Sequence, residues 1–135
     1  MARERGVTLV ELMVVVAVIA ILAALGYPMY LEQQLKGRRT DGKAMLHHVM
    51  QQLERYYTEN NSFTDDLDEL GFGAGTVTSE HGAYTITLAA GATGDLDTSV
   101  TATATPAAAD DKCGTLTLSS DLRKTASGSQ PDICW

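Results

Sequence analysis

The chain has 135 residues, enough for a membrane segment and one small domain, and a formal net charge of −7. Twelve of its 17 acidic residues lie from Glu59 to the end, so the sequence does not favour nucleic acid as a partner, because affinity for phosphate backbones rests on Lys and Arg. No grouping of Ser, His and Asp and no phosphate loop stands out. We therefore expect no enzymatic activity and no cofactor.

The first predicted element is an apolar helix. Every residue from 12 to 25 is apolar, and the run carries one charge, Glu11, near its start. About 20 apolar residues are enough to cross a bilayer as a helix. A carboxylate inside such a span is costly, which indicates a function for Glu11; the alternative is an interfacial side chain without a role. Arg3 and Arg5 precede the run and predict that this end stays in the cytoplasm.

Residues 6–17 resemble the class III signal of type IV prepilins, with a short charged leader, Gly6, four residues, Glu11 and an apolar run. The resemblance implies that residues 1–6 are a leader, that a prepilin peptidase cuts between Gly6 and Val7, and that Val7 is then N-methylated. The family usually has Phe at the position of Val7. An ordinary secretory signal differs, because its cleavage site follows the apolar core.

Gly26 and Pro28 follow the apolar run and predict a helix break. In pilins such a proline marks a segment that can lose helicity in the filament, and a simple kink is the alternative. The helical pattern then resumes, so residues 7–59 are predicted as one long helix and residues 7–30 as its membrane and filament-core half. The basic residues at 36–43 are interpreted as a solvated helix face or a subunit contact.

Residues 60–83 are predicted as a connection from helix to sheet, with one short helix at 65–70 that Thr64 caps. Alternating apolar and polar residues at 84–88, 100–105 and 116–118 predict strands, and a fourth short strand is predicted at 122–125. The expected fold is α+β. An antiparallel sheet of three to four strands over residues 84–119 packs on the second half of the long helix, and residues 120–135 form a C-terminal loop.

Cys113 and Cys134 indicate one disulfide in an oxidising compartment, with two buried free thiols as the alternative. His47 and His48 are adjacent on a helix and His81 is alone in a loop, so no metal site is expected. The acidic residues at 65–69 lack the spacing of a calcium loop and are interpreted as a solvated helix start, with calcium binding as the alternative.

Residues 54–63, the Thr-Ala repeat that ends at Pro106, and the segment from Cys113 to residue 118 with the closing Cys134 and Trp135 resemble small minor pilins. The resemblance implies the type IV pilin fold, with a Cys113–Cys134 disulfide that bounds the C-terminal loop. It implies a structural subunit in pilus assembly, twitching motility and adhesion. Glu11 is the expected counter-charge of the N-terminal amine.

The resemblance also implies a location and partners. The helix is expected in the inner membrane of a Gram-negative bacterium, among lipids and the pilus assembly machinery, with the rest of the chain in the periplasm. It then packs with other pilin subunits in an extracellular filament. The alternatives are a major pilin, a pseudopilin of type II secretion and, from another class, a ligand-binding or adhesive module.

Overall fold

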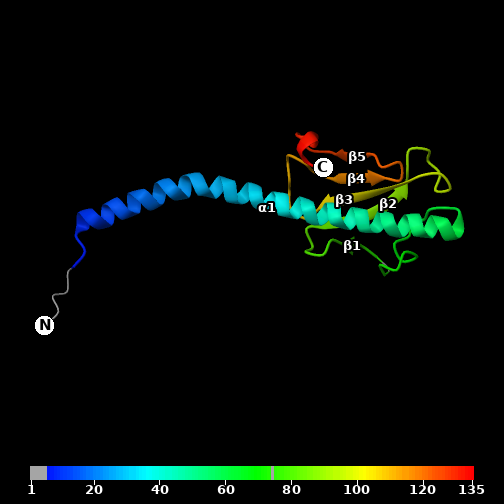
Figure 1. Cartoon of the computed structure of the whole chain (residues 1–135), viewed down its shortest axis with the longest axis horizontal. Helices are drawn as coiled ribbons and strands as arrows, with labels where there is room; N and C mark the ends of the chain where they lie inside the picture. The colour runs from blue at the N-terminus through cyan, green and yellow to red at the C-terminus, as the bar shows by residue number, and fades with distance from the viewer. Residues whose placement is uncertain (1–5, 74) are drawn as a thin grey trace. The chain divides into compact units, whose positions relative to one another are not determined.

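The computed structural model describes residues 6–73 and 75–135, which form one long helix, a five-stranded sheet and a short 3-10 helix (Figure 1). Helix α1 spans Leu9–Asn60, and the 3-10 helix η1 spans Pro131–Ile133. The chain divides into two units, one that ends at Leu35 and one that runs from Lys36 to Trp135. We call the second unit the head. Helix α1 contributes to both units.

The first half of α1 is apolar on all sides. Side chains from residue 9 to residue 31 are exposed in the single chain, and α1 is long and apolar enough to cross a membrane. A helix that is hydrophobic all round is stable only where lipid or other protein covers it. The first half of α1 therefore needs partners that a single chain does not supply.

Helix α1 is continuous through Gly26 and Pro28, so the predicted break is absent from the single chain. A proline inside a helix removes one backbone hydrogen bond and crowds the preceding turn. The hydrogen bonds of the turns on either side remain and carry the helix past that position. A loss of helicity on packing into a filament stays a prediction.

The second half of α1 supplies one side of the core of the head. Its buried apolar side chains recur at helical spacing, at Leu46, Val49, Met50 and Leu53. The sheet supplies the other side through inward-facing residues that alternate with threonines, chiefly Ile86, Val100, Ala102, Ala104, Leu116 and Leu118. This alternation is why a Thr-rich sequence forms a sheet with one buried face.

The sheet is an antiparallel meander in the order β1-β2-β3-β4-β5. Its strands are β1 (Val77–Thr78), β2 (Tyr84–Ala90), β3 (Val100–Pro106), β4 (Leu116–Ser119) and β5 (Lys124–Ala126). The central register places Ile86 opposite Ala104, and Ala102 opposite Leu118. The α+β fold is therefore confirmed, with one strand more than the three to four expected.

Two local predictions in the connection from helix to sheet are wrong. Strand β1 lies inside residues 60–83, which were predicted as a connection without strands. Two residues are too few to show an alternation of apolar and polar side chains. Residues 65–70 form bends and turns rather than a helix. The hydroxyl of Thr64 accepts a hydrogen bond from the Asp66 amide at 3.0 Å, and the carboxylate of Asp66 accepts one from the Asp68 amide at 2.9 Å. Such side-chain contacts compete with helix formation.

Candidate functional site

The predicted processing and assembly residues Gly6, Val7 and Glu11 lie at the start of α1. Gly6 and Val7 are exposed and precede the helix, and Glu11 lies in its first turn. The Glu11 amide donates a hydrogen bond to the Thr8 hydroxyl at 3.3 Å, so Thr8 caps the helix. This cap was not predicted from the sequence, although Thr8 and Glu11 have the spacing of a capping box.

The cap explains why the helix begins at residue 9 and leaves the segment before it accessible. Cleavage after Gly6 would create an amine at Val7, directly before the capping residue. A carboxylate in the first turn is favoured by the partial positive charge of the helix N-terminus. The local structure therefore presents one anionic group beside the place where a new cationic terminus would arise.

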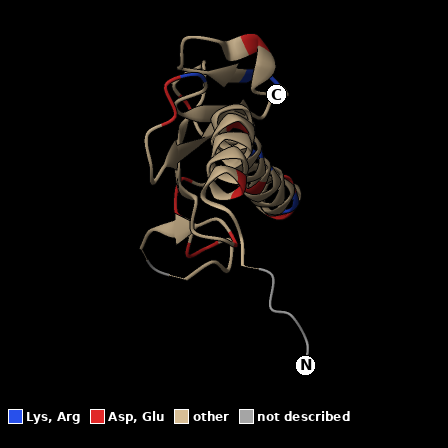
Figure 2. Cartoon of the chain, turned by 90° about the vertical axis from the view of Figure 1, so that its left-hand side faces the viewer, with Lys and Arg blue, Asp and Glu red and all other residues tan. Residues whose placement is uncertain are grey.

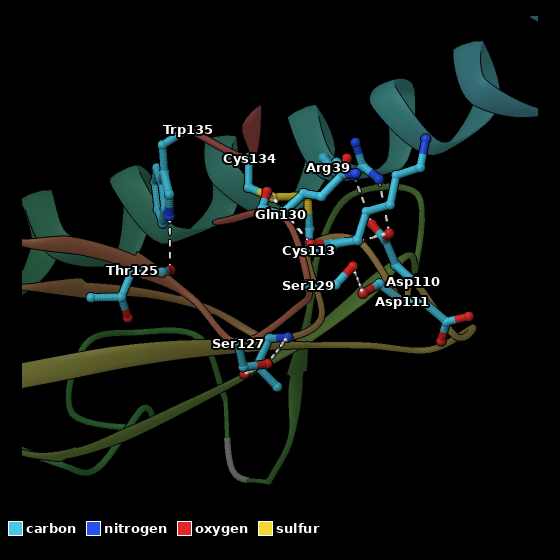
Figure 3. Close-up of a disulfide and its surroundings, with 12 residues drawn as sticks. Arg39, Asp110, Asp111, Cys113, Thr125, Ser127, Ser129, Gln130, Cys134 and Trp135 are labelled. Atoms are coloured by element: carbon cyan, nitrogen blue, oxygen red, sulfur yellow. Dashed lines mark hydrogen bonds and ion pairs between the residues drawn. A yellow bond between two sulfur atoms is a disulfide. The ribbon is translucent and has the colours of Figure 1, made fainter. Parts of the chain in front are cut away.

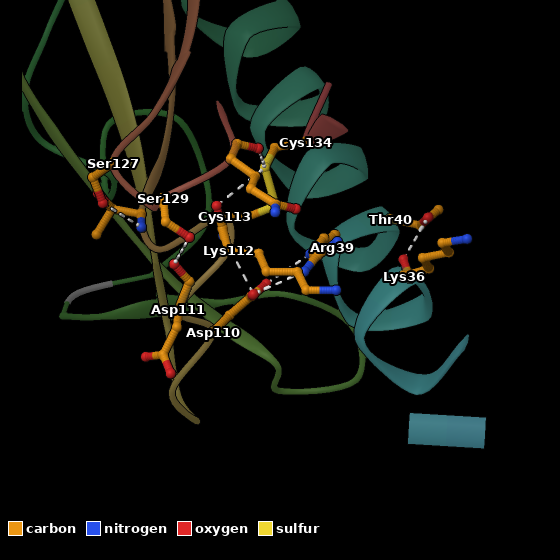
Figure 4. A network of polar contacts seen from close by, with 12 residues as sticks. Lys36, Arg39, Thr40, Asp110, Asp111, Lys112, Cys113, Ser127, Ser129 and Cys134 are labelled. Carbon is orange, nitrogen blue, oxygen red and sulfur yellow. Dashed lines mark hydrogen bonds and ion pairs between the residues drawn. A yellow bond between two sulfur atoms is a disulfide. The ribbon is translucent and has the colours of Figure 1, made fainter. Parts of the chain in front are cut away.

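A buried ion pair joins α1 to the connection between strands β3 and β4 inside the head (Figures 3 and 4). The Arg39 side chain donates two hydrogen bonds to the carboxylate of Asp110, from Nε at 2.7 Å and from a terminal nitrogen at 2.8 Å. The two side chains are only 3% and 4% exposed. The hydrogen bonds from Arg39 hold the pKa of Asp110 below its ordinary value, although burial acts in the opposite direction.

The disulfide lies directly beside this ion pair and is confirmed as Cys113–Cys134 (Figure 3). Both cysteines are fully buried, and the Cys113 amide donates to Asp110 Oδ1 at 3.3 Å. The bridge encloses β4, β5 and η1. Gly128 lies so close to the backbone of Lys112 that a Cβ atom at position 128 would be 2.3 Å from the Lys112 carbonyl carbon. The covalent and ionic links thus anchor the C-terminal segment at one place in the core.

The C-terminal residue is also held against the head. The Trp135 indole donates a hydrogen bond to the Thr125 carbonyl at 2.8 Å, and its ring lies at 89° to the ring of His47 on α1, with the centroids 6.3 Å apart. The Lys124 ammonium lies 5.4 Å from the same ring. These contacts connect the end of the chain to β5 and to α1.

Gly42 looks unfavourable in the sequence, because glycine weakens a helix interior. In the structure it is buried where the ring of Tyr84 from β2 meets α1. A Cβ atom at this position would lie 2.7 Å from Tyr84 Cδ2. Glycine therefore permits the close approach of sheet and helix near the Arg39–Asp110 pair.

His81 is not alone in its loop, as the sequence suggested, but contacts Asp41 on α1. Its Nδ1 lies 3.1 Å from Asp41 Oδ1. The hydrogen bond to Asp41 raises the pKa of His81. Burial acts to raise the pKa of Asp41, but hydrogen bonds from Ser79 and His81 outweigh it and lower that pKa. Within residues 6–73 and 75–135, no group of three or more metal-ligating side chains occurs.

Comparison with known proteins identifies the family. A family model described as "Type IV minor pilin ComP, DNA uptake sequence receptor" matches residues 28–117, two thirds of the chain. The chain belongs to the type IV pilins. A second model, the prokaryotic N-terminal methylation motif, matches residues 1–27, which contain the class III signal. The apolar half of α1 and its preceding signal are therefore those of a pilin.

The individual relatives are similar to this chain over only part of their own length. The type IV major pilin protein PilA of Myxococcus xanthus is 36% identical over 70 residues, which cover 52% of this chain and 32% of that protein. The type IV wide pilus major component PilA4 of Thermus thermophilus is 38% identical over 66 residues, 49% of this chain and 50% of that protein. The chain thus matches from a third to half of these two relatives.

A solved structure shows the same fold. The high-resolution structure of a type IV pilin from Shewanella oneidensis superposes with a TM-score of 0.53, at 24% identity. The match covers 74% of this chain and 96% of that one. The shared fold is the long N-terminal helix with an antiparallel sheet.

Proposed function

We propose that the chain is a minor pilin, processed after Gly6 and packed through the apolar half of α1 into a type IV pilus. The observation that carries this proposal is the exposed, all-apolar surface of residues 12–25, which begins directly after Glu11 in the first turn of a helix that Thr8 caps. A contiguous exposed apolar surface of this size marks an interaction site. Membrane lipid covers it before assembly, and neighbouring subunits cover it afterwards.

The proposed role of Glu11 follows from electrostatics in a low dielectric. A subunit that enters the filament core carries a positive amine at Val7, and N-methylation leaves that charge in place. An unpaired charge in an apolar environment costs several kcal/mol, whereas a pair with good geometry offsets the cost. Glu11 of a neighbour, or of the same chain, supplies the counter-charge. Contacts that join unlike surfaces of successive copies build an open helical filament.

Substitution of Glu11 by Gln tests this role, because Gln keeps the size of the side chain and removes its charge. We expect unchanged membrane insertion and a reduction of about tenfold or more of this subunit in sheared pili. Met13→Leu, an apolar substitution on the same turn of helix, serves as the matched control and should assemble normally. Normal incorporation of the Glu11→Gln chain would contradict the proposed pairing.

Mass spectrometry of purified pili distinguishes the minor pilin from its alternatives. We expect peptides of this chain at low abundance relative to another pilin, an N-terminus at Val7 and a mass increase of one methyl group there. A dominant abundance would instead make the chain a major pilin. Absence from pili, together with presence in a secretion complex, would make it a pseudopilin.

The matching family is described as a DNA uptake sequence receptor, and we infer that the head of this chain is not suited to that role. The head contains eight basic and fourteen acidic residues, and the acidic positions are spread over α1 and the loops (Figure 2). DNA binding depends on the neutralisation of phosphates by Lys and Arg. Retardation of duplex DNA by the purified chain at physiological salt would contradict this inference.

A further inference from the structure

A pocket of about 420 Å³ lies at the end of the head that is farthest along α1 from Lys36. Three segments line it: the last turn of α1 and the residues that follow, the β2–β3 loop, and the β4–β5 turn. Its volume is within the range of sites that hold small molecules. The pocket is separate from the disulfide, the Arg39–Asp110 pair and the apolar half of α1.

An aromatic pair forms one side of the pocket. Tyr57 stacks on Phe63 with ring centroids 4.5 Å apart and an angle of 28° between the ring planes. Phe63 packs against the core, and its amide donates to the Leu96 carbonyl in the β2–β3 loop at 2.9 Å. Tyr57 is 38% exposed and lines the pocket. Phe63 therefore supports a tyrosine ring that remains accessible to a ligand.

Hydroxyl groups form the opposite walls. The Thr93 hydroxyl lies 2.5 Å from that of Thr98 and 2.6 Å from that of Ser99, and these contacts order the β2–β3 loop. Ser119, Ser120 and Asp121 contribute from the β4–β5 turn. Each hydroxyl has one donor and two acceptor positions, so groups that already bond one another keep capacity for a ligand. The side chain of Asp121 is 53% exposed and adds a strong acceptor.

The charge of the pocket limits what it can bind. Among its described lining residues Asp121 is the one charged group, and its carboxylate pairs with Arg123 Nε at 3.7 Å just outside the lining. No lining cation is left to hold a phosphate, a nucleic acid or an acidic sugar. A purely apolar ligand would cover the hydroxyls and the carboxylate without offering them the hydrogen bonds that water supplies. A neutral ligand that carries several hydroxyl groups and one apolar face satisfies both requirements.

We propose that this pocket binds a neutral saccharide. The C–H face of a pyranose ring would lie on Tyr57, since polarised C–H groups are attracted to the negative face of an aromatic ring. Its hydroxyl groups would bond with Thr93, Ser99 and Asp121. This inference goes beyond the filament role and does not depend on it, because the pocket belongs entirely to the head.

Saturation-transfer NMR on the unassembled full-length chain tests the proposal, with maltose, lactose and cellobiose as probes. The chain is held in a zwitterionic detergent without a sugar headgroup. We expect transfer to the ring protons of at least one disaccharide, and about tenfold weaker binding by Tyr57→Ala. Tyr57→Phe should retain binding because it keeps the ring face. Tyr56→Ala is the matched control, since Tyr56 bonds Glu69 at 2.9 Å and does not line the pocket.

Circular dichroism establishes whether Tyr57→Ala remains folded. If it does not, Asp121→Ala replaces it, because this exposed acceptor can be removed without disturbing the core, and several-fold weaker binding is then expected. Absence of transfer to all three disaccharides would overturn the proposal. So would unchanged binding by folded Tyr57→Ala.

Discussion

The two halves of α1 have similar backbones and opposite sources of stability. From residue 9 to residue 31 every side chain is exposed, so contacts within the chain do not account for the apolar residues there. From Arg39 onward the helix buries one face against the sheet of its own chain. The apolar half depends on lipid or neighbouring subunits, whereas the head supplies its own partners. Substitutions in the head should therefore change its unfolding and leave membrane insertion intact.

The largest effect is expected from Arg39→Met. The substitution leaves the Asp110 carboxylate buried without its partner, and we expect the free energy of unfolding of the head to fall by about 3–5 kcal/mol. Fluorescence of Trp135, the single tryptophan of the chain, follows denaturant unfolding of the head. The double variant Arg39→Met/Asp110→Leu should lose less than Arg39→Met alone. Wild-type stability of the single variant would show that the ion pair does not stabilise the contact of α1 with the β3–β4 connection.

Removal of the disulfide is expected to have the next largest effect. The two cysteines are 21 residues apart in sequence, and a bridge over such a loop contributes about 3 kcal/mol by restricting the unfolded chain. The Cys113→Ala/Cys134→Ala chain should unfold at a correspondingly lower denaturant concentration. The wild-type chain under reducing conditions is the control and should shift similarly. A change in the membrane insertion of either sample would contradict the conclusion that the apolar half of α1 and the head have separate sources of stability.

Gly42→Ala and Gly37→Ala form a matched pair on α1. Alanine gains about 1 kcal/mol over glycine in a helix. At position 42 the new Cβ would meet the Tyr84 ring, and such overpacking costs about 1–3 kcal/mol, so a net loss is expected. At position 37 the space is open, and the gain should appear in full. Thermal unfolding of the two variants should move in opposite directions; equal shifts would contradict the packing argument.

The smallest effect concerns the His81–Asp41 contact and depends on pH. Because the contact raises the pKa of His81 above 6.5, its contribution is complete below that pH. It declines as the pH rises through the pKa of the folded state. Wild-type chain and His81→Gln should therefore differ most in thermal midpoint in mild acid and least in alkali.

Local patterns carried the predictions that succeeded. Contiguous residues with a visible periodicity or spacing form the long helix, the strands β2, β3 and β4, and the class III signal. The capping by Thr8 could have been predicted from its spacing to Glu11. Strand β1 could not, because it exists through its pairing with β2, where Val77 lies opposite Ile86.

Residue patterns along the chain were enough to predict the family resemblance, the apolar assembly helix and the alternation that buries one face of the sheet. Contacts between residues far apart in the chain became known only from the folded molecule. Arg39 and Asp110 are 71 residues apart and His81 and Asp41 are 40 apart, so nothing in their local sequence indicates that they pair. It also placed Gly42 against the Tyr84 ring, and Tyr57 in one pocket with the hydroxyls of the β2–β3 loop and the β4–β5 turn. The physical reason is that pairing and packing depend on chain topology, which local residue patterns do not specify.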